Sequence, residues 1–298
     1  MRRPIIVVFL SLFLMMSQVL AAERGALFRV TGHGHTLHLY GTIHVGRAEY
    51  YPLEPRIRQA LAAASTLALE VDMKGNEAAI MAALARHGMF PAGSPGIAAL
   101  PAERRAHIES ALRRQGVDPA QAGVMKPWML VVVLAMNDAL KLGYDPTLGV
   151  DDHLAQLARA NPARKTRVTE LETMEFQAAL LNRMPDEEQW RLLEETLEDI
   201  ASGRQLRETR ELFEAYDRAD RKAQDAIAQR LENDDSLGGR YTRELLLDAR
   251  NGPMADKIVS LLARENNAVV AVGLLHLVGQ RGIPELLRKR GIKVERIY

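Results

Sequence analysis

Gly41-Thr42-Ile43-His44 ends the apolar run of residues 37–40, and Gly273-Leu274-Leu275-His276 ends a second apolar run, residues 268–272, near the other end of the chain. In both places a β-rich run stops at a glycine, and a histidine follows three residues later. A strand that ends in this way places an imidazole just beyond its carboxyl edge, where open α/β sheets bind ligands. The glycine tolerates positive φ and leaves room for close approach of a substrate or a neighbouring strand. Two such motifs in one chain predict a functional site at a sheet edge.

Two further predicted strands end in acidic residues. Residues 66–72 are an apolar run with Glu70 near its end, and residues 165–172 end at Glu172. A predicted helix over residues 52–64 joins the first G-x-x-H motif to the strand at 66–72, and such a βαβ unit has parallel strands and a right-handed crossover. Because parallel strands present their carboxyl ends at one edge, we expect Glu70 to lie beside the first histidine.

The rest of the chain is mostly helical by its 3.6-residue apolar period. Residues 186–231 are charged and amphipathic, which predicts a solvated helical cap with i,i+4 ion pairs. Residues 128–136 are apolar all round, which is typical of a buried core helix or of a partner interface. The other expected elements are a hairpin of strands 27–30 and 36–40, helices 76–88, 101–115, 121–142, 240–250, 254–264 and 284–290, and a last strand 292–297.

These elements predict an α/β fold with a central, mostly parallel sheet made of two βαβ-type halves and a large helical insertion or cap. We expect a single domain from residue 22 to residue 298. Its core should span about residues 25–75, 145–175 and 240–298, with helical insertions at about residues 76–144 and 175–239.

The first residues have the features of a signal peptide. Met1-Arg2-Arg3 is a basic start, residues 5–14 are apolar, and Val19-Leu20-Ala21 satisfies the small-residue rule for cleavage before Ala22. Residues 1–21 are therefore predicted to be removed on export to the periplasm. The alternative is an uncleaved membrane anchor, but the apolar run is shorter than the ~20 residues of a membrane-spanning helix.

Composition excludes several classes of function. Lys and Arg total 39 against 38 for Asp and Glu, which gives a net charge of +1 and no basic stripe with interleaved aromatic residues. The chain is thus not expected to bind nucleic acid. It has no cysteine, so a cysteine nucleophile and thiolate metal sites are excluded, and any metal ligands must be His, Asp or Glu.

If the four strands form one parallel sheet, His44, Glu70, Glu172 and His276 converge at one edge. Two imidazoles with one or two carboxylates suit Zn, Mn, Fe or Co, and two His with one Glu match a common hydrolytic zinc set, although no H-E-x-x-H helix is present. Without a metal, the same groups can act on water as general base and acid. Asp151 or Asp152 is expected to cap the helix that follows Gly149.

The sequence resembles the TraB/GumN family, which is grouped with the Tiki proteins and, more distantly, with the erythromycin esterase and ChaN-like proteins. The resemblance covers nearly the whole mature chain. The motifs that carry it are Gly41-Thr42-Ile43-His44, Leu67-Ala68-Leu69-Glu70-Val71-Asp72, Lys126-Pro127-Trp128, Gly149-Val150-Asp151, Leu171-Glu172-Thr173 with Gln177, Arg250-Asn251 with Met254, and residues 270–279 followed by Gly282 and Pro284.

The resemblance implies an α/β core of two halves with a helical insertion, and a site built from His44, Glu70 and His276. By matched position, Glu172 and Arg250 also belong to this site. Tiki proteins are described as metal-dependent proteases, whereas the esterase relatives open a lactone ring with a histidine-activated water. Leu275 departs from the family pattern, which often has a small residue before the second histidine, and a larger side chain there is expected to narrow the pocket or reorient His276.

We therefore expect an exported hydrolase. A divalent metal (Mn, Co or Zn) held by His44, Glu70 and His276 would lower the pKa of bound water toward ~7. Glu172 would be a base or a further ligand, and Arg250 would stabilise the oxyanion. The first expectation for the substrate is a peptide bond. The alternatives are a metal-independent hydrolase of small esters, and a periplasmic protein that binds a peptide or metal without turnover.

Overall fold

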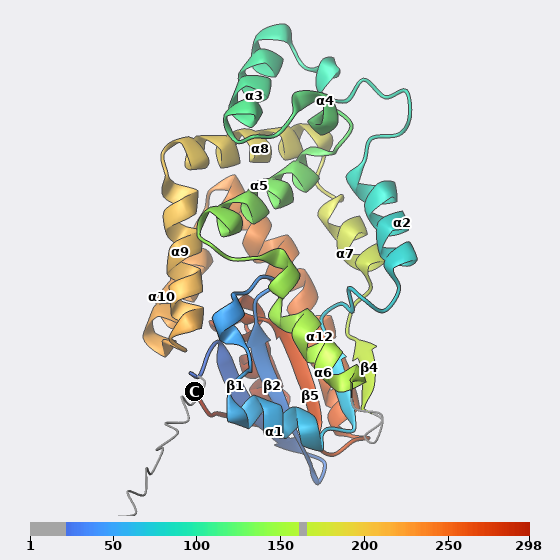
Figure 1. Ribbon diagram of the computed structural model, residues 1–298, viewed down its shortest axis with the longest axis vertical. Helices are drawn as coiled ribbons and strands as arrows, with labels where there is room; N and C mark the ends of the chain where they lie inside the picture. The colour runs from blue at the N-terminus through green and yellow to red at the C-terminus, as the bar shows by residue number, and fades with distance from the viewer. Residues whose placement is uncertain (1–21, 161–165) are drawn as a thin grey trace, which may run out of the picture.

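The computed structural model describes residues 22–160 and 166–298, so the expected signal peptide at residues 1–21 lies outside the described residues. The described chain forms a six-stranded sheet with the strand order β4-β3-β5-β2-β1-β6 (Figure 1). The strands are β1 (Ala26–Gly32), β2 (His35–Thr42), β3 (Thr66–Leu69), β4 (Arg167–Glu170), β5 (Ala268–Gly273) and β6 (Lys293–Arg296).

The sheet is mostly parallel, as expected. Strands β2, β5, β3 and β4 are parallel neighbours, and β1 runs antiparallel to both β2 and β6. The β1–β2 hairpin turns at His33 and Gly34, whose φ angles of 53° and 78° are those of a tight hairpin turn. Residues 268–272 of β5 are fully buried, which explains why their sequence is continuously apolar rather than alternating. Because β5 lies between β2 and β3, the second G-x-x-H motif comes between His44 and Glu70.

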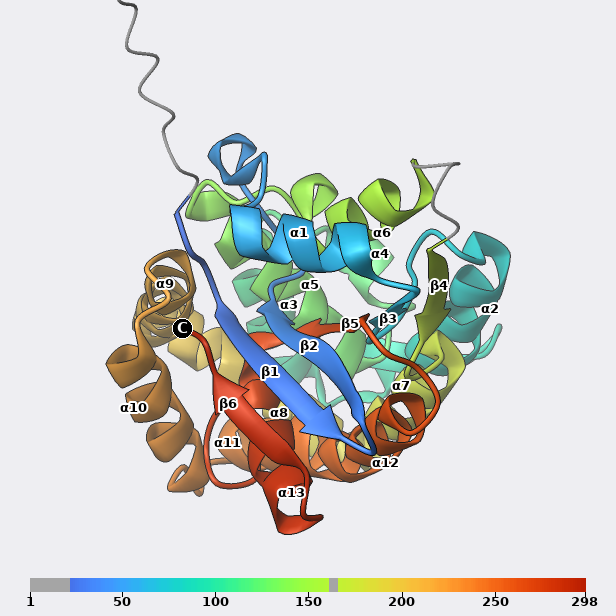
Figure 2. The ribbon, with the colours of Figure 1, turned by 90° about the horizontal axis from the view of Figure 1, so that it is seen from below.

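Helices cover both faces of the sheet (Figure 2). Helices α1 (Pro55–Ala63) and α6 (Val150–Arg159) lie on one face, and α12 (Ala249–Leu262) and α13 (Ile283–Lys289) lie on the other. Their buried aliphatic residues form one core with the strands. This layering leaves only the edges of the sheet open, including the edge where the parallel strands end.

A second group of helices stands beyond the carboxyl ends of the parallel strands (Figure 1). It has its own apolar core, in which Leu130 and Leu134 of α5 pack with Trp190 and Leu193 of α8. Within the described ranges, no helix is long and apolar enough to cross a membrane. This core is formed by α3 (Ala102–Arg114), α4 (Pro119–Ala122), α5 (Pro127–Lys141) and α8 (Asp186–Ala201). Helices α2 (Glu77–Gly88) and α7 (Met174–Leu181) pack against each other. Helices α9 (Arg204–Asp217) and α10 (Arg221–Glu232) pack on the core of the sheet through Phe213, Tyr216 and Ala228.

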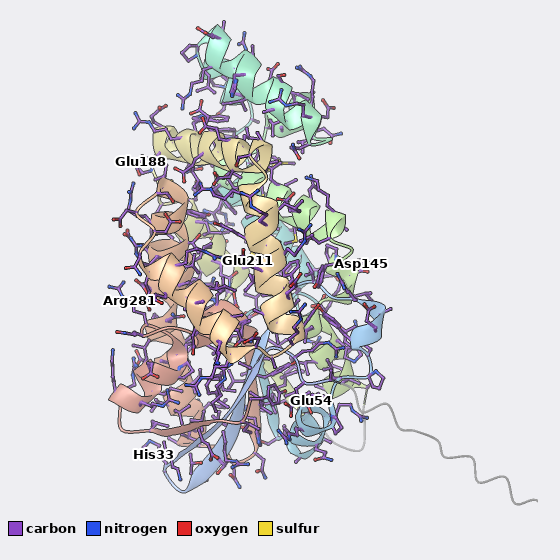
Figure 3. All side chains as sticks on the ribbon, turned by 90° about the vertical axis from the view of Figure 1, so that its left-hand side faces the viewer. His33, Glu54, Asp145, Glu188, Glu211 and Arg281 are labelled. Carbon is purple, nitrogen blue, oxygen red and sulfur yellow. The ribbon has the colours of Figure 1, made fainter. Side chains whose placement is uncertain are left out.

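The charged segment forms the expected solvated helices. Figure 3 shows Glu211 of α9 on the outer face of the molecule, where it pairs with Arg230 of α10 at 2.9 Å. Glu214 and Arg218 form an i,i+4 pair at 3.3 Å. By contrast, the apolar helix α5 is buried along one face through Leu130, Leu134 and Asp138 but leaves Val132 38% exposed, so it is not buried all round.

Two predicted helix boundaries are wrong. The single helix expected over residues 121–142 is divided into α4 and α5, because Gly123 ends the first and Pro127 begins the second. The break expected at Pro253 is absent from the described chain: α11 (Leu237–Arg240), a π-helical segment (Tyr241–Asp248) and α12 follow one another directly. Pro253 thus lies inside α12, one turn after the π-helical segment ends.

Candidate functional site

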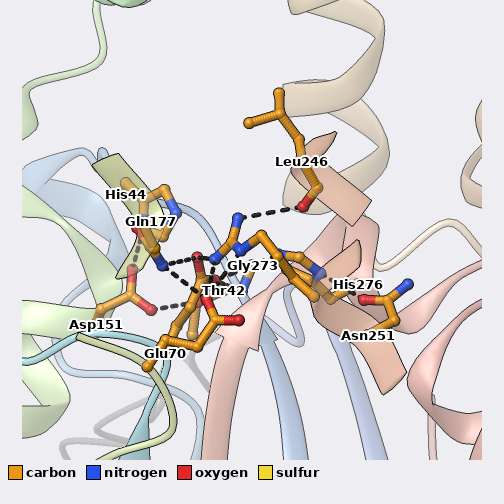
Figure 4. A network of polar contacts seen from close by, with 11 residues as sticks. Thr42, His44, Glu70, Asp151, Gln177, Leu246, Asn251, Gly273 and His276 are labelled. Carbon is orange, nitrogen blue, oxygen red and sulfur yellow. Dashed lines mark hydrogen bonds and ion pairs between the residues drawn. The ribbon is translucent and has the colours of Figure 1, made fainter. Parts of the chain in front are cut away.

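The residues predicted for the site lie together at the carboxyl edge of the parallel strands (Figure 4). Glu70 directly follows β3, Glu172 follows β4 by two residues, and His44 follows β2 by two residues. His276 lies in the short 3-10 helix Leu274–Leu277 after β5. Arg250 reaches the same place from α12. Parallel pairing of Thr42 with Gly273 aligns the two G-x-x-H motifs side by side.

Arg250 joins the two carboxylates. Its Nη2 contacts Glu70 Oε1, and its Nε donates to Glu172 Oε2 at 2.8 Å. Gln177 Nε2 donates to the same two oxygens, at 3.1 Å each. The third nitrogen of Arg250, Nη1, donates to the carbonyl of Leu246 in the π-helical segment, a type of helix that is frequent at functional sites. Arg250, Glu70 and Glu172 are at most 6% exposed, so this is a buried ion network.

Each histidine has a polar partner behind it, on Nδ1 (Figure 4). His44 Nδ1 lies 2.9 Å from Asp151 Oδ2, and the Thr42 hydroxyl donates to the other oxygen of Asp151. His276 Nδ1 lies 2.6 Å from Asn251 Oδ1. The Nε2 atom of each ring therefore lies on the side away from this partner. The His44 side chain is 59% exposed, whereas His276 is 4% exposed, so the site is open to solvent on the His44 side.

The absence of a side chain at Gly273 leaves a small space among these groups. A Cβ atom placed there would lie 3.4 Å from Glu70 Oε2, 3.6 Å from His276 Cδ2 and 3.7 Å from His44 Nε2. The backbone N–H of Gly273 donates to Glu70 Oε2 at 3.0 Å, and His276 Nε2 is 3.6 Å from the same oxygen. The three predicted residues therefore converge in front of Gly273, where an added methyl group would contact all three.

The surroundings move the pKa values of the four titratable groups apart. Burial alone would raise the pKa of Glu70, but the positive charges around it, including Arg250, hold it well below its usual range. Partial desolvation of the ring disfavours the charged form of His44, but the charge and hydrogen bond of Asp151 outweigh it and raise the pKa of His44 to about 9. Burial lowers the pKa of His276 to about 4 and raises the pKa of Glu172. Such divergence is typical of acid–base sites.

The expected metal ligands do not fit a metal. In the part of the chain that the structure describes, no group of three or more His, Asp or Glu side chains has the spacing of a metal site. The reason is local: Glu70 Oε1 accepts from Arg250 and Gln177, and Glu70 Oε2 accepts from Gly273 N–H. The positive charge that a cation would supply to Glu70 is already supplied by the Arg250 guanidinium.

Sequence analysis missed three residues of the site. Asp151 was expected to be a helix cap, but Gly149 is the N-cap of α6 and Asp151 lies inside the helix, where its side chain is free to contact His44. Asn251 and Gln177 belong to the motifs of the family resemblance but were given no role. Leu275 is half-buried and packs against the main core; His276 keeps its hydrogen bond to Asn251 beside it.

Comparison with known proteins places the whole folded chain in one family. The model of the TraB/PrgY/gumN family matches residues 26–296, from β1 to the end of β6. The uncharacterized protein YbaP of Shigella flexneri is 27% identical over 260 residues, which cover 86% of this chain and 89% of YbaP. YbaP of Escherichia coli (strain K12) matches with the same identity and coverage. No solved structure is significantly similar. The chain belongs to the TraB/PrgY/gumN family.

Proposed function

We propose that this protein is a hydrolase that cleaves a carbonyl-containing bond, a peptide bond or a small ester, with a water molecule activated in the space in front of Gly273. The observation that carries the proposal is the convergence of three side chains in front of Gly273. A Cβ atom placed on Gly273 would lie 3.4 Å from Glu70 Oε2, 3.6 Å from His276 Cδ2 and 3.7 Å from His44 Nε2. An attacking water needs an acceptor for its proton within hydrogen-bond reach, and this space offers both an imidazole and a carboxylate.

His44 is the general base in this proposal. Its Nδ1–H is directed to Asp151 Oδ2, which leaves Nε2 facing the space and the solvent. A carboxylate on Nδ1 orients an imidazole and stabilises the imidazolium that forms when Nε2 takes a proton from water. The proton then passes from Nε2 to the leaving group, so that the imidazole is regenerated.

Glu70 and Arg250 provide the electrostatic setting. Glu70 is ionised, and its Oε2 accepts a hydrogen bond from Gly273 N–H. The same oxygen can also accept a hydrogen bond from the attacking water and so orient it. The guanidinium of Arg250 is fixed by both glutamates, and a preorganised positive charge in a buried site stabilises negative charge that develops on a carbonyl oxygen. Glu172 Oε1 is buried and has no hydrogen-bond partner within the described ranges, and burial raises the pKa of Glu172, so this carboxylate is suited to take up a proton during the reaction.

The route through a protein-held water is favoured over a metal because the Arg250 guanidinium already supplies positive charge beside Glu70. The substrate class remains the one expected from sequence: peptide bonds and small esters both present the carbonyl carbon that this arrangement can attack. We place the reaction in the periplasm, on the strength of the basic start, apolar run and cleavage sequence of residues 1–22.

The substitution Gly273→Ala tests this function. The φ angle of Gly273 is −51°, which alanine adopts freely, and the added Cβ would make ordinary van der Waals contacts of 3.4–3.7 Å. The variant should therefore fold normally while its methyl group displaces the water. We expect hydrolysis of p-nitrophenyl esters and of a fluorogenic peptide library to fall roughly 100-fold or more, with an unchanged urea midpoint.

The matched control is Gly252→Ala in α12, where an added Cβ meets nothing within 4 Å. It should keep full activity. His44→Ala should lose roughly 10²–10⁴-fold in kcat/KM. Full activity of Gly273→Ala or of His44→Ala would overturn the proposal, and so would a wild-type protein that binds peptides from the library but cleaves none.

A further inference from the structure

We propose that Asn251 is a positioning residue for His276: it holds the proton on Nδ1 and directs Nε2 toward Glu70 and the space in front of Gly273. The proposal rests on the function proposed above, because it assigns how the second histidine is presented to that space. His276 Nδ1 and Asn251 Oδ1 are 2.6 Å apart, and the two residues are only 4% and 2% exposed. Water is thus excluded as a competing partner for either group.

The orientation of the Asn251 amide is fixed by a second contact. Its Nδ2 donates to the carbonyl oxygen of Arg281 at 3.0 Å. The atom that faces His276 is therefore Oδ1, which can only accept, so the imidazole must donate from Nδ1. Asn251 directly follows Arg250 in α12. One turn of helix thus holds both carboxylates, through Arg250, and the second histidine, through Asn251.

The alternative partner of His276 lies on the other side of its ring. Glu70 Oε2 is 3.6 Å from His276 Nε2, and this distance is too long for a hydrogen bond. Among the described residues, Glu70 Oε2 is nevertheless the acidic oxygen that lies next to this nitrogen. If Nδ1 lost its acceptor, the ring proton would move to Nε2 and be directed at Glu70. Asn251 therefore decides which nitrogen of His276 can accept a proton or a hydrogen bond from substrate or water.

The tautomer can be measured directly, without a substrate. Nitrogen-15 NMR of histidine-labelled protein should show His276 as the Nδ1–H form. Asn251→Leu removes the acceptor at similar volume and should convert His276 to the Nε2–H form. Asn251→Asp retains an acceptor and should keep Nδ1–H. Asn233→Leu, at an exposed helix end, is the control and should leave the His276 signals unchanged.

Activity provides a second readout. Asn251→Leu should lower kcat roughly 10–100-fold with little change in KM, and Asn251→Asp should lose less. An Nε2–H tautomer in the wild-type protein overturns the proposal, and so does an unchanged tautomer in a folded Asn251→Leu. If Asn251→Leu does not fold, the tautomer of His276 in the wild-type protein and in Asn251→Asp still tests the proposal. If the protein proves not to be a hydrolase, the tautomer measured by NMR still tests the role of Asn251.

Discussion

His44 Nδ1 lies 2.9 Å from Asp151 Oδ2, although 107 residues separate the two in sequence. The contact is possible because β2 ends beside the start of α6. The absence of a side chain at Gly149 lets the helix start close to the backbone of His44: a Cβ atom there would lie 3.0 Å from His44 O. The Thr42 hydroxyl holds the remaining oxygen of Asp151, so that one carboxylate orients both polar side chains of the Gly41-Thr42-Ile43-His44 motif. Asp151 thereby links the first motif to the acid–base chemistry of the site.

This contact predicts the pH dependence of hydrolysis. A general base acts in its neutral form, and the pKa of His44 is raised to about 9, so kcat/KM should rise with pH through about 9. Asp151→Asn removes the charge that raises the pKa, and the rising limb should move to lower pH while the plateau falls roughly 10–100-fold. The measurement is a pH profile of kcat/KM for a p-nitrophenyl ester.

Asp152→Asn is the control for this profile, because Asp152 carries the same charge on the same helix but, among the described residues, it is Asp151 that forms the hydrogen bond with His44. Its rising limb should stay near that of the wild-type protein. The raised pKa also links to stability: this contribution is fully present below the ordinary His pKa of 6.5 and is lost as pH rises through about 9. A rising limb that does not move in Asp151→Asn would contradict the role of His44 as base.

The positions of the strand-end residues could be predicted from the sequence because each follows a short apolar run, and parallel strands end at one edge. This places His44, Glu70, Glu172 and His276 without any knowledge of side-chain geometry. The insertion of β5 between β2 and β3 could not be predicted, because strand order depends on packing between distant segments. The same holds for the continuous helix through Pro253, because regular helix geometry predicts a break there.

The partners of the site residues were harder to predict. Asp151, Asn251 and Gln177 lie in helices, where polar residues are common and most often face solvent or cap an end. Only the tertiary structure shows that Asp151 is 7% exposed and Asn251 2% exposed, and burial of a polar side chain is what marks it as hydrogen-bonded. The expected metal set did not account for a related contact: Arg250 pairs with both Glu70 and Glu172 and places a positive charge where a cation was expected.

Metal removal should not affect the reaction. Because the Arg250 guanidinium already pairs with Glu70, a cation bound to Glu70 would lie beside a fixed positive charge. Protein purified without chelator should contain less than one equivalent of Mn, Co or Zn by plasma mass spectrometry, and dialysis against EDTA should leave kcat/KM unchanged. Loss of activity in EDTA that is restored by one of these ions would establish the metal-dependent reaction instead.

Export predicts a defined amino terminus. The order of basic start, apolar run and Val19-Leu20-Ala21 should give a mature chain that begins at Ala22 in the periplasmic fraction. Amino-terminal sequencing of the exported protein checks this. Ala21→Arg should block cleavage and leave the precursor with the membrane, whereas Glu23→Gln, just after the site, should be processed normally. A wild-type protein that retains Met1 would show that the segment is an anchor.

The buried ion network predicts a large and pH-dependent loss of stability in Arg250→Met. The substitution leaves Glu70 and Glu172 buried without their cation, and breaking a buried pair in this way costs about 3–5 kcal/mol. Without Arg250 the pKa values of both carboxyls should rise, so the variant should regain stability as pH falls and they become neutral. Adding Glu70→Gln should restore part of the loss at pH 7, because it removes one uncompensated charge. Urea unfolding at pH 5 and pH 8 measures both effects.

Arg290→Met is the matched control: Arg290 pairs with Asp256, whose side chain is 69% exposed, and its loss should cost about 1 kcal/mol or less. Equal losses in the two variants would show that the Arg250 network does not behave as a buried one.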